Sequence, residues 1–271
     1  MYVVTHKAYK VSVALSTKRC YHAASLKNSM TTANQPSFKD LMSKMNDNAS
    51  QVAPTVQVQG KKKLDVRYNF NQGWYDALLN TDMVLCTKDE AKDLRLDPLA
   101  KRQIVEIGVY EGASSCFWSD FYLGNPDSRL TSIDPFTGSA EHHEAPENYP
   151  ELADIEVIAR GNISMSDNAA KIEIIKGCSW DVFPELNRRN QGEAWIDVLY
   201  IDGAHDSTSV ARDTTLYVPM VKPGGIVIFD DYGHPDVKRG VDMALNAFAS
   251  MQLAVFTGWQ LVCKVSSETA K

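Results

Sequence analysis

Five short apolar runs recur along the chain beyond Lys101, each separated from the next by a stretch of helix length. The runs are apolar at consecutive positions, which is typical of parallel strands buried on both faces. The amphipathic stretches between them predict crossover helices. The expected strands are 104–110, 130–134, 171–177, 195–203 and 224–231, and the expected helices are 113–122, 180–189, 208–220 and 237–251. Pro223, Gly224 and Gly225 are expected to break the helix before the fifth strand.

Two further apolar runs, 252–256 and 259–265, end the pattern and are joined only by Thr257 and Gly258. A connection of this length suits a hairpin and cannot hold a crossover helix, so the last strand must be antiparallel. We therefore expect an α/β protein with a doubly wound, mostly parallel seven-stranded sheet that ends in an antiparallel C-terminal hairpin. Such a hairpin differs from the six parallel strands of dinucleotide dehydrogenases.

The N-terminal third follows a different pattern. No acidic residue precedes Asp40, and residues 1–39 are rich in Ser, Thr and Ala, as in an organelle transit peptide. Alternatively, Met30 is the true start and the preceding residues are an extension. We expect 1–63 to be a disordered or targeting extension, 64–100 a helical cap and 101–271 the main domain. The compartment is then cytoplasmic, or mitochondrial or another organelle if the transit reading holds.

The composition and charge of the chain argue against some classes of function. The 271 residues are 44% hydrophobic and 23% charged, an ordinary globular balance. Because residues 1–39 carry a charge of +6 and the whole chain −6, the remainder carries −12, which argues against a nucleic-acid partner. The five cysteines form no C-x-x-C pair, and no apolar run is long enough to cross a bilayer.

The first expected strand runs into a glycine-bearing turn, residues 106–115, with Gly108 and Gly112. Glycines at such a turn let a ligand approach the backbone beside a helix N-terminus, although a plain tight turn would look similar. Asp134 ends the second strand, where a carboxylate can accept both ribose hydroxyls of an adenosine. This geometry serves NAD and S-adenosylmethionine alike. Glu106 and the missing third glycine favour S-adenosylmethionine, because a carboxylate suits an amino group and repels pyrophosphate.

The segments IVEIGVYEGASS, GCSWDVFPEL, YIDGAHD and VIFDDY occur in this order between residues 104 and 232. With them the chain resembles the class I S-adenosylmethionine-dependent methyltransferases, and within these the metal-dependent O-methyltransferases of the catechol type, over roughly residues 101–265. The resemblance implies a Rossmann-like methyltransferase fold. It also implies that Ser179 and Trp180 contact adenine, although Trp180 could instead be a core residue. The implied cofactor-binding residues are Glu106, Gly108, Tyr110, Gly112, Ser114, Asp134, Ser179, Trp180 and Asp202.

Three carboxylates follow two neighbouring expected strands. Asp202 ends the fourth strand, and Asp230 with Asp231 ends the fifth, so all three open into one crevice. Carboxylates so close together call for a cation or shared protons, and oxygen ligands select Mg²⁺, Ca²⁺ or Mn²⁺. We expect a divalent cation, Mg²⁺ above all, at this place. The alternative is that Asp231 caps a loop and Asp202 only forms a turn with Gly203.

His205 lies three residues beyond Asp202, where the catechol enzymes carry a lysine base. Histidine can accept a proton near neutral pH or bind a metal, so His205 and Asp202 are the expected catalytic residues. A merely solvated loop histidine is the alternative. Asp231 replaces the asparagine usual in the catechol enzymes, and the layout of residues 201–232 is more similar to methyltransferases that tailor sugars and other secondary metabolites. Asp213 could cap or pair on its helix.

The connection between Asp134 and Lys171 is unusually long and contains Phe136, His142, His143 and Tyr149. Long connections beside a site are often lids, so we expect it to cover the substrate. The two adjacent histidines could bind a metal, but a solvated loop is the preferred interpretation.

Together these features predict O-methyl transfer from S-adenosylmethionine to a small hydroxylated acceptor such as a sugar, a polyketide or a catechol-like compound, assisted by a divalent cation. A metal-independent small-molecule methyltransferase, a non-catalytic cofactor-binding module and a nicotinamide oxidoreductase are the alternatives. A nucleic-acid or amide methyltransferase would carry Pro-Pro-aromatic at the fourth strand end, where this chain has Ile201 and Asp202. We expect no nucleic-acid or membrane partner, and a homo-oligomer is compatible with the sequence.

Overall fold

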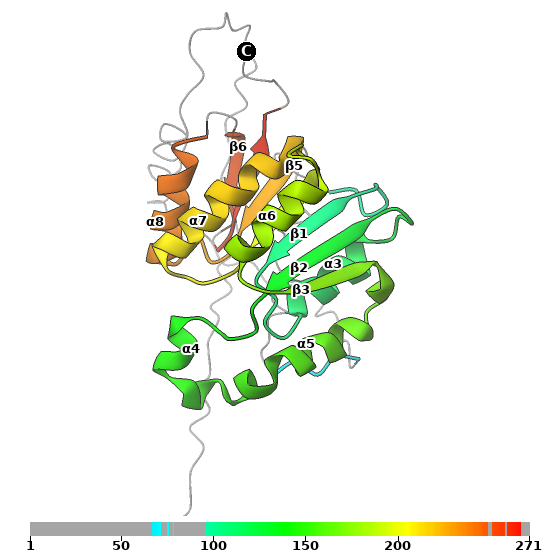
Figure 1. Cartoon of the computed structure of the whole chain (residues 1–271), viewed down its shortest axis with the longest axis vertical. Helices are drawn as coiled ribbons and strands as arrows, with labels where there is room; N and C mark the ends of the chain where they lie inside the picture. Colours follow the sequence, from blue (N-terminus) through cyan, green and yellow to red (C-terminus); the bar gives the residue numbers. More distant parts are fainter. Residues whose placement is uncertain are drawn as a thin grey trace, which may run out of the picture.

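The computed structural model describes residues 67–71, Tyr75, Leu78, 96–248, 251–257 and 259–266, without the side chains of 252–254. These residues form one seven-stranded sheet of order β3-β2-β1-β4-β5-β7-β6 (Figure 1). Strands β1 to β5 are parallel, and β7 pairs antiparallel with both β5 and β6. The predicted doubly wound sheet with its antiparallel hairpin is confirmed. The strands are β1 Gln103–Ile107, β2 Arg129–Asp134, β3 Ile172–Lys176, β4 Ile196–Ile201, β5 Val221–Phe229, β6 Met251–Phe256 and β7 Leu261–Val265.

Helices cover both faces of the sheet (Figure 1). Helices α3 (Ala113–Tyr122) and α5 (Ile155–Ser164) bury Phe117, Trp118 and Ala159 against one face. Helices α6 (Ser179–Arg189), α7 (Ser207–Tyr217) and α8 (Pro235–Leu245) bury apolar side chains against the other face. This two-sided burial explains why the strands read as unbroken apolar runs. No helix among the described residues is long and apolar enough to cross a membrane.

Several predicted boundaries were wrong. The first strand, expected to reach residue 110, ends at Ile107. Residues Pro223, Gly224 and Gly225 lie inside β5, where the pairing with β4 skips from Val221 to Ile226, so they bulge out of the ladder instead of preceding the strand. The helix expected to run to residue 251 ends at Leu245, and residue 251 already begins β6. Helix α7 passes into the 3₁₀ turn η5 (Val218–Met220), because proline has no amide proton to continue an α-helix.

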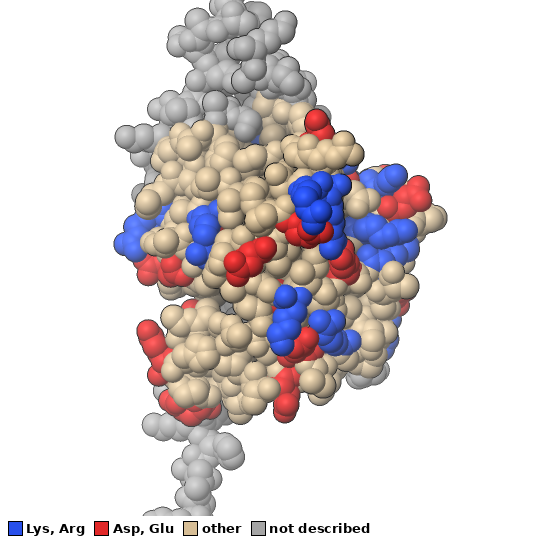
Figure 2. Space-filling model, viewed as in Figure 1, with Lys and Arg blue, Asp and Glu red and all other residues tan. Residues whose placement is uncertain are grey.

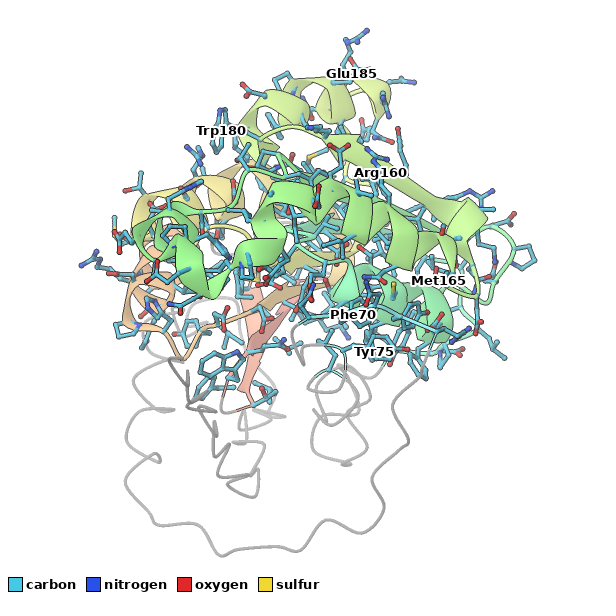
Figure 3. The ribbon with its side chains drawn as sticks, turned by 90° about the horizontal axis from the view of Figure 1, so that it is seen from below. Phe70, Tyr75, Arg160, Met165, Trp180 and Glu185 are labelled. Atoms are coloured by element: carbon cyan, nitrogen blue, oxygen red, sulfur yellow. The ribbon has the colours of Figure 1, made fainter. Side chains whose placement is uncertain are left out.

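The described part of the predicted cap packs on α3. Tyr68 and Tyr75 both donate their hydroxyls to Asp120, at 2.6 and 2.7 Å, and Phe70 stacks on Tyr75 (Figure 3). Tyr75 and Leu78 are helical, as expected. The described residues 67–71 and 96–100 of the predicted cap are not helical. The rest of the cap lies outside the described residues, as do the extension at 1–63 and its possible transit peptide.

A polar cluster lies beneath the first strand. Glu106 is fully buried, and its carboxylate accepts hydrogen bonds from Ser115 of α3 and, at 2.7 Å, from Ser132 of β2. Its other carboxylate oxygen has no partner among the described residues. Burial raises the pKa of Glu106 to about 7, although hydrogen bonds from serines oppose this effect. Glu106 is therefore an ionisable group buried in the core, at the start of the glycine-bearing turn at residues 106–115.

A matched pair of glycine substitutions tests the packing of α7 on α8. A Cβ atom on Gly240 would lie 2.5 Å from the carbonyl oxygen of Ser207 and 2.8 Å from Cβ of Val210. Gly240→Ala should therefore lower the free energy of unfolding by roughly 1–3 kcal/mol, although alanine favours helix. Gly161→Ala in α5 meets no described atom within 4 Å and should raise it by up to about 1 kcal/mol. Urea denaturation of both variants checks this, and equal effects would contradict it.

The buried Glu106 should make stability depend on pH. Between the ordinary pKa of 4.5 and about 7, the folded protein keeps a proton that the unfolded chain has released. Stability contributed by this group is therefore full below pH 4.5 and is lost as the pH rises to 7, by about 3 kcal/mol. Glu106→Gln should remove that loss. Denaturation of both proteins at pH 5 and 8 measures it, and parallel changes in the two would refute the assignment.

Candidate functional site

A cavity of about 560 Å³ opens at the carboxyl ends of β1, β2, β4 and β5, within the size range of small-molecule sites. The turn after β1, the N-terminus of α6 and the connection after β2 also contribute to its walls. Nearly all the sequence-predicted residues meet there. The cavity is lined by Gly108, Tyr110, Ser114, Asp134, Ser179, Trp180, Asp202, His205, Asp230 and Asp231.

The two glycines of the turn are required by packing of the backbone. Gly108 has a φ of 92°, and a Cβ atom there would lie 1.8 Å from the carbonyl oxygen of Asp202. Gly112 has a φ of 84°, and its Cβ would press on Ile163 of α5. Such angles and approaches exclude other residues. The turn is therefore held against the end of β4 and against α5, so both glycines are needed for packing whether or not a ligand approaches them.

Asp134 holds the turn from the side of β2. Its Oδ2 accepts hydrogen bonds from the amides of Val109 and Tyr110, at 2.7 and 3.1 Å, and its Oδ1 accepts one from Phe136 at 2.5 Å. A carboxylate has about four acceptor positions, so capacity for a ligand hydroxyl is left. Glu106, in contrast, lies behind the turn and does not line the cavity.

The N-terminus of α6 brings Ser179 and Trp180 into the lining of the cavity. Trp180 is 42% exposed, so the alternative of a core tryptophan is wrong (Figure 3). The guanidinium of Arg212 lies 3.5 Å from the centre of the indole ring. Ser179 donates its hydroxyl to Asp213 at 2.5 Å, so Asp213 pairs across helices. Burial raises the pKa of Asp213 to about 6.

The possible metal ligands differ from the predicted set, because His205 takes the place of Asp230. Asp202, His205 and Asp231 each offer a ligand atom within 4.8 Å of the others. Asp230 instead accepts the Tyr200 hydroxyl at 2.6 Å, and its Oδ1 has no hydrogen-bond partner among the described residues. Burial, followed by the charges of Asp230 and Asp231, raises the pKa of Asp202 well above its usual value. Burial and then Asp231 raise the pKa of Asp230 to about 6.

His205 joins this cluster from the loop after β4. Its Nε2 lies 2.8 Å from Asp231, and its Nδ1 lies 3.0 Å from Oε1 of Glu141. Burial lowers the pKa of His205, but the two carboxylates outweigh burial and raise it to about 11. The hydrogen bond to His205 lowers the pKa of Glu141 to about 2. The alternative of a solvated loop histidine is therefore wrong.

Glu141 belongs to α4 (Ala140–Glu144) in the long connection after β2. The sequence offered no periodic signal for this contact, because Glu141 and His205 are far apart in the chain. His142 stacks on Tyr110, with ring centres 5.2 Å apart, and its Nδ1 accepts from the Ser139 amide at 3.0 Å. Among the described residues, His142 and His143 are not part of a possible metal group. The second half of the connection is α5, an ordinary crossover helix.

Comparisons with known proteins agree with this geometry. Residues 105–232 match the family model described as a methyltransferase domain. An uncharacterised protein of Acanthamoeba polyphaga mimivirus is 30% identical over 131 residues, which cover 47% of this chain and half of that protein's length.

Two solved structures are similar to part of this chain. The O-methyltransferase NovP is 24% identical, with a TM-score of 0.48, covering 61% of this chain and 72% of that one. An O-methyltransferase from Bacillus cereus, in complex with S-adenosylhomocysteine, is 17% identical, with a TM-score of 0.44, covering 61% and 74%.

The family match spans β1 to the end of β5, which is the part of the sheet that carries the turn, Asp134 and the acidic cluster. These strands belong to a Rossmann-like sheet that ends in an antiparallel hairpin, as predicted from the sequence. Residues 105–232 are therefore similar to a methyltransferase domain.

Proposed function

We propose that this protein transfers the methyl group of S-adenosylmethionine to an oxygen atom of a small hydroxylated acceptor, such as a sugar, a polyketide or a catechol-like compound, with help from a divalent cation. The observation that carries the proposal is the contact between the glycine turn and the acids. Gly108 lies against the main chain of Asp202, so donor turn and acidic cluster share one cavity. Donor and acceptor oxygen would therefore meet in line.

The cofactor would lie along the cavity wall with adenine at the N-terminus of α6 and its methionine end at the glycine turn. Trp180 and Ser179 would hold adenine, and Asp134 would accept one ribose hydroxyl at its remaining acceptor position. Trp180 is 42% exposed, and because the Arg212 guanidinium covers one face of its ring, adenine would stack on the other face. The methionine end would then lie on the turn, with Glu106 acting from behind through its hydrogen bond to Ser115. The proposed methionine-end residues are Gly108, Tyr110, Gly112 and Ser114.

The acidic cluster fits a hard cation such as Mg²⁺. Carboxylates of Asp202 and Asp231 lie close enough to share one ion, and burial makes the charge of Asp202 unfavourable. Asp230 has a buried oxygen without a partner among the described residues, so it could add a ligand after a side-chain rotation. A bound divalent cation would hold the acceptor oxygen and lower its pKa.

In the proposed reaction, the acceptor oxygen attacks the sulfonium methyl carbon as the carbon–sulfur bond breaks. The methyl group gains the new carbon–oxygen bond, S-adenosylhomocysteine leaves, and the hydroxyl proton passes to a base. Asp202 and His205 both line the cavity beside the turn and are the proposed acceptors of this proton. Because its two carboxylate partners raise the pKa of His205 to about 11, His205 could accept the proton only after a bound cation or the acceptor has displaced one of these partners. A metal-independent variant of the same reaction is the second candidate, supported by the 2.8 Å pair of His205 and Asp231, in which Asp231 orients the imidazole.

We further propose that the binding partner is the small acceptor molecule and that the protein does not bind nucleic acid. On the face seen in Figure 2, Lys and Arg side chains are interspersed with Asp and Glu, so that face offers no broad basic surface for a phosphate backbone. Residues 64–100 would act as a cap beside the cavity, since Leu78 lines it.

Removal of divalent cations tests the proposed assistance. The purified protein, S-adenosylmethionine and a panel of sugars, catechols and polyketide glycosides are incubated, and methylated product is detected by mass spectrometry. Treatment with a chelator should lower turnover on any active acceptor by about a hundredfold, and added Mg²⁺ should restore it. Unchanged turnover would support the metal-independent candidate. S-adenosylhomocysteine binding by calorimetry, with NAD as the competitor, separates both from an oxidoreductase.

A pair of aspartate substitutions tests the acidic cluster. Asp202→Asn should lower turnover at least about a hundredfold, because it removes a charge where the acceptor oxygen must be held. His205→Ala should lower it about 10²- to 10⁴-fold. Asp206→Asn is the matched control. Asp206 caps α7 by accepting from the Thr208 and Ser209 amides, and asparagine can keep this cap, so both stability and turnover should change little. Full activity of Asp202→Asn would exclude the proposed role.

A further inference from the structure

Tyr110 connects the cofactor turn to the connection that covers the cavity. Its hydroxyl donates a 2.7 Å hydrogen bond to Glu151 of the 3₁₀ helix η3 (Pro150–Asp154), and its ring stacks on His142 of α4 at 5.2 Å. His142 also meets Tyr149 edge to face, with ring centres 4.5 Å apart. One side chain from the turn therefore contacts both halves of residues 139–151, here called the lid.

The backbone of Tyr110 is fixed by the proposed ribose carboxylate. Oδ2 of Asp134 accepts from the Tyr110 amide, and Oδ1 accepts from the Phe136 amide, at the start of the connection that leads to the lid. Tyr110 and Phe136 have φ angles of 49° and 55°, which cost bulky residues about 1–3 kcal/mol each. Both conformations persist because surrounding contacts hold them. Asp134 is thus the junction at which a ligand in the cavity can change the position of Tyr110.

The lid has a second anchor at the acceptor side. Glu141 of the lid pairs with His205, which in turn contacts Asp231. The lid therefore spans from the cofactor turn to the acidic cluster, and its docking completes the wall next to the acceptor. Lid residues that line the cavity include Ser139, Glu141, His142 and Tyr149.

We infer that Tyr110 and Glu151 are positioning residues that dock the lid on the cofactor turn, so that the acceptor site is completed when the cofactor is bound. This inference rests on the proposed function. A ribose hydroxyl that donates to Asp134 would fix the turn and Phe136 in the geometry that the docked lid requires. A ligand shifts a conformational equilibrium only through such differential contacts. The docked lid would then shield the acceptor from water.

Hydrogen exchange of the full chain tests this, with S-adenosylhomocysteine at a concentration shown by calorimetry to be saturating for each protein. In the unmodified protein, the ligand should slow exchange of amides in residues 139–151 about tenfold. Tyr110→Phe and Glu151→Leu remove opposite ends of the same hydrogen bond. Both should reduce this protection to less than about twofold while the ligand is bound.

Tyr68→Phe is the matched control, because it also removes a tyrosine hydroxyl that donates to a carboxylate, but on the far side of α3. It should keep the full ligand-induced protection of the lid. Full protection in Tyr110→Phe and Glu151→Leu with ligand bound would overturn the inference. Absence of S-adenosylhomocysteine binding by the unmodified protein would instead overturn the proposed function, so the two failures are distinguishable.

Discussion

The contact between the main chains of Gly108 and Asp202 determines how this site is built. Asp202 donates its amide to the carbonyl of Ile107 at 2.8 Å, and Gly108 donates its amide to Ile133 at 2.9 Å, so three strand ends are tied together. Any side chain at position 108 would collide with the Asp202 carbonyl. This close approach brings the turn after β1 and the acids after β4 and β5 to one cavity. The proposed transfer depends on that proximity.

The same arrangement concentrates negative charge where burial makes it unfavourable. The pKa values of Asp202 and Asp230 are raised first by burial and then by neighbouring carboxylates. His205 offsets part of this charge by lying between Asp231 and Glu141. Unfavourable electrostatics of this kind are typical of functional sites, since a core chosen for stability alone would hold apolar groups there. The buried carboxylates therefore lower the stability of the fold at the place where the proposed chemistry needs them.

The strand ends could be predicted from the sequence, because two-sided burial makes each strand an unbroken apolar run and topology places the carboxyl ends at one edge. That reasoning located Asp134, Asp202 and the pair at 230 and 231 correctly. It could not decide which of the adjacent acids faces His205. Asp231 adopts a left-handed φ of 50°, while Asp230 points to Tyr200, and this difference depends on tertiary contacts.

Other features were beyond sequence reasoning for related reasons. Helix α4 spans only five residues, too few for a periodic pattern, so the contact of Glu141 with His205 had no signal. Proline and glycine within β5 were interpreted as a break, because a bulge that keeps the ladder on both sides has the same composition.

The most direct test of the account is a crystal structure of the protein with S-adenosylhomocysteine. The account predicts that adenine lies against Trp180, that a ribose hydroxyl bonds to Asp134, and that the sulfur atom faces Asp202 beside Gly108. A ligand bound outside this cavity, or with its adenine at the acidic cluster, would contradict it.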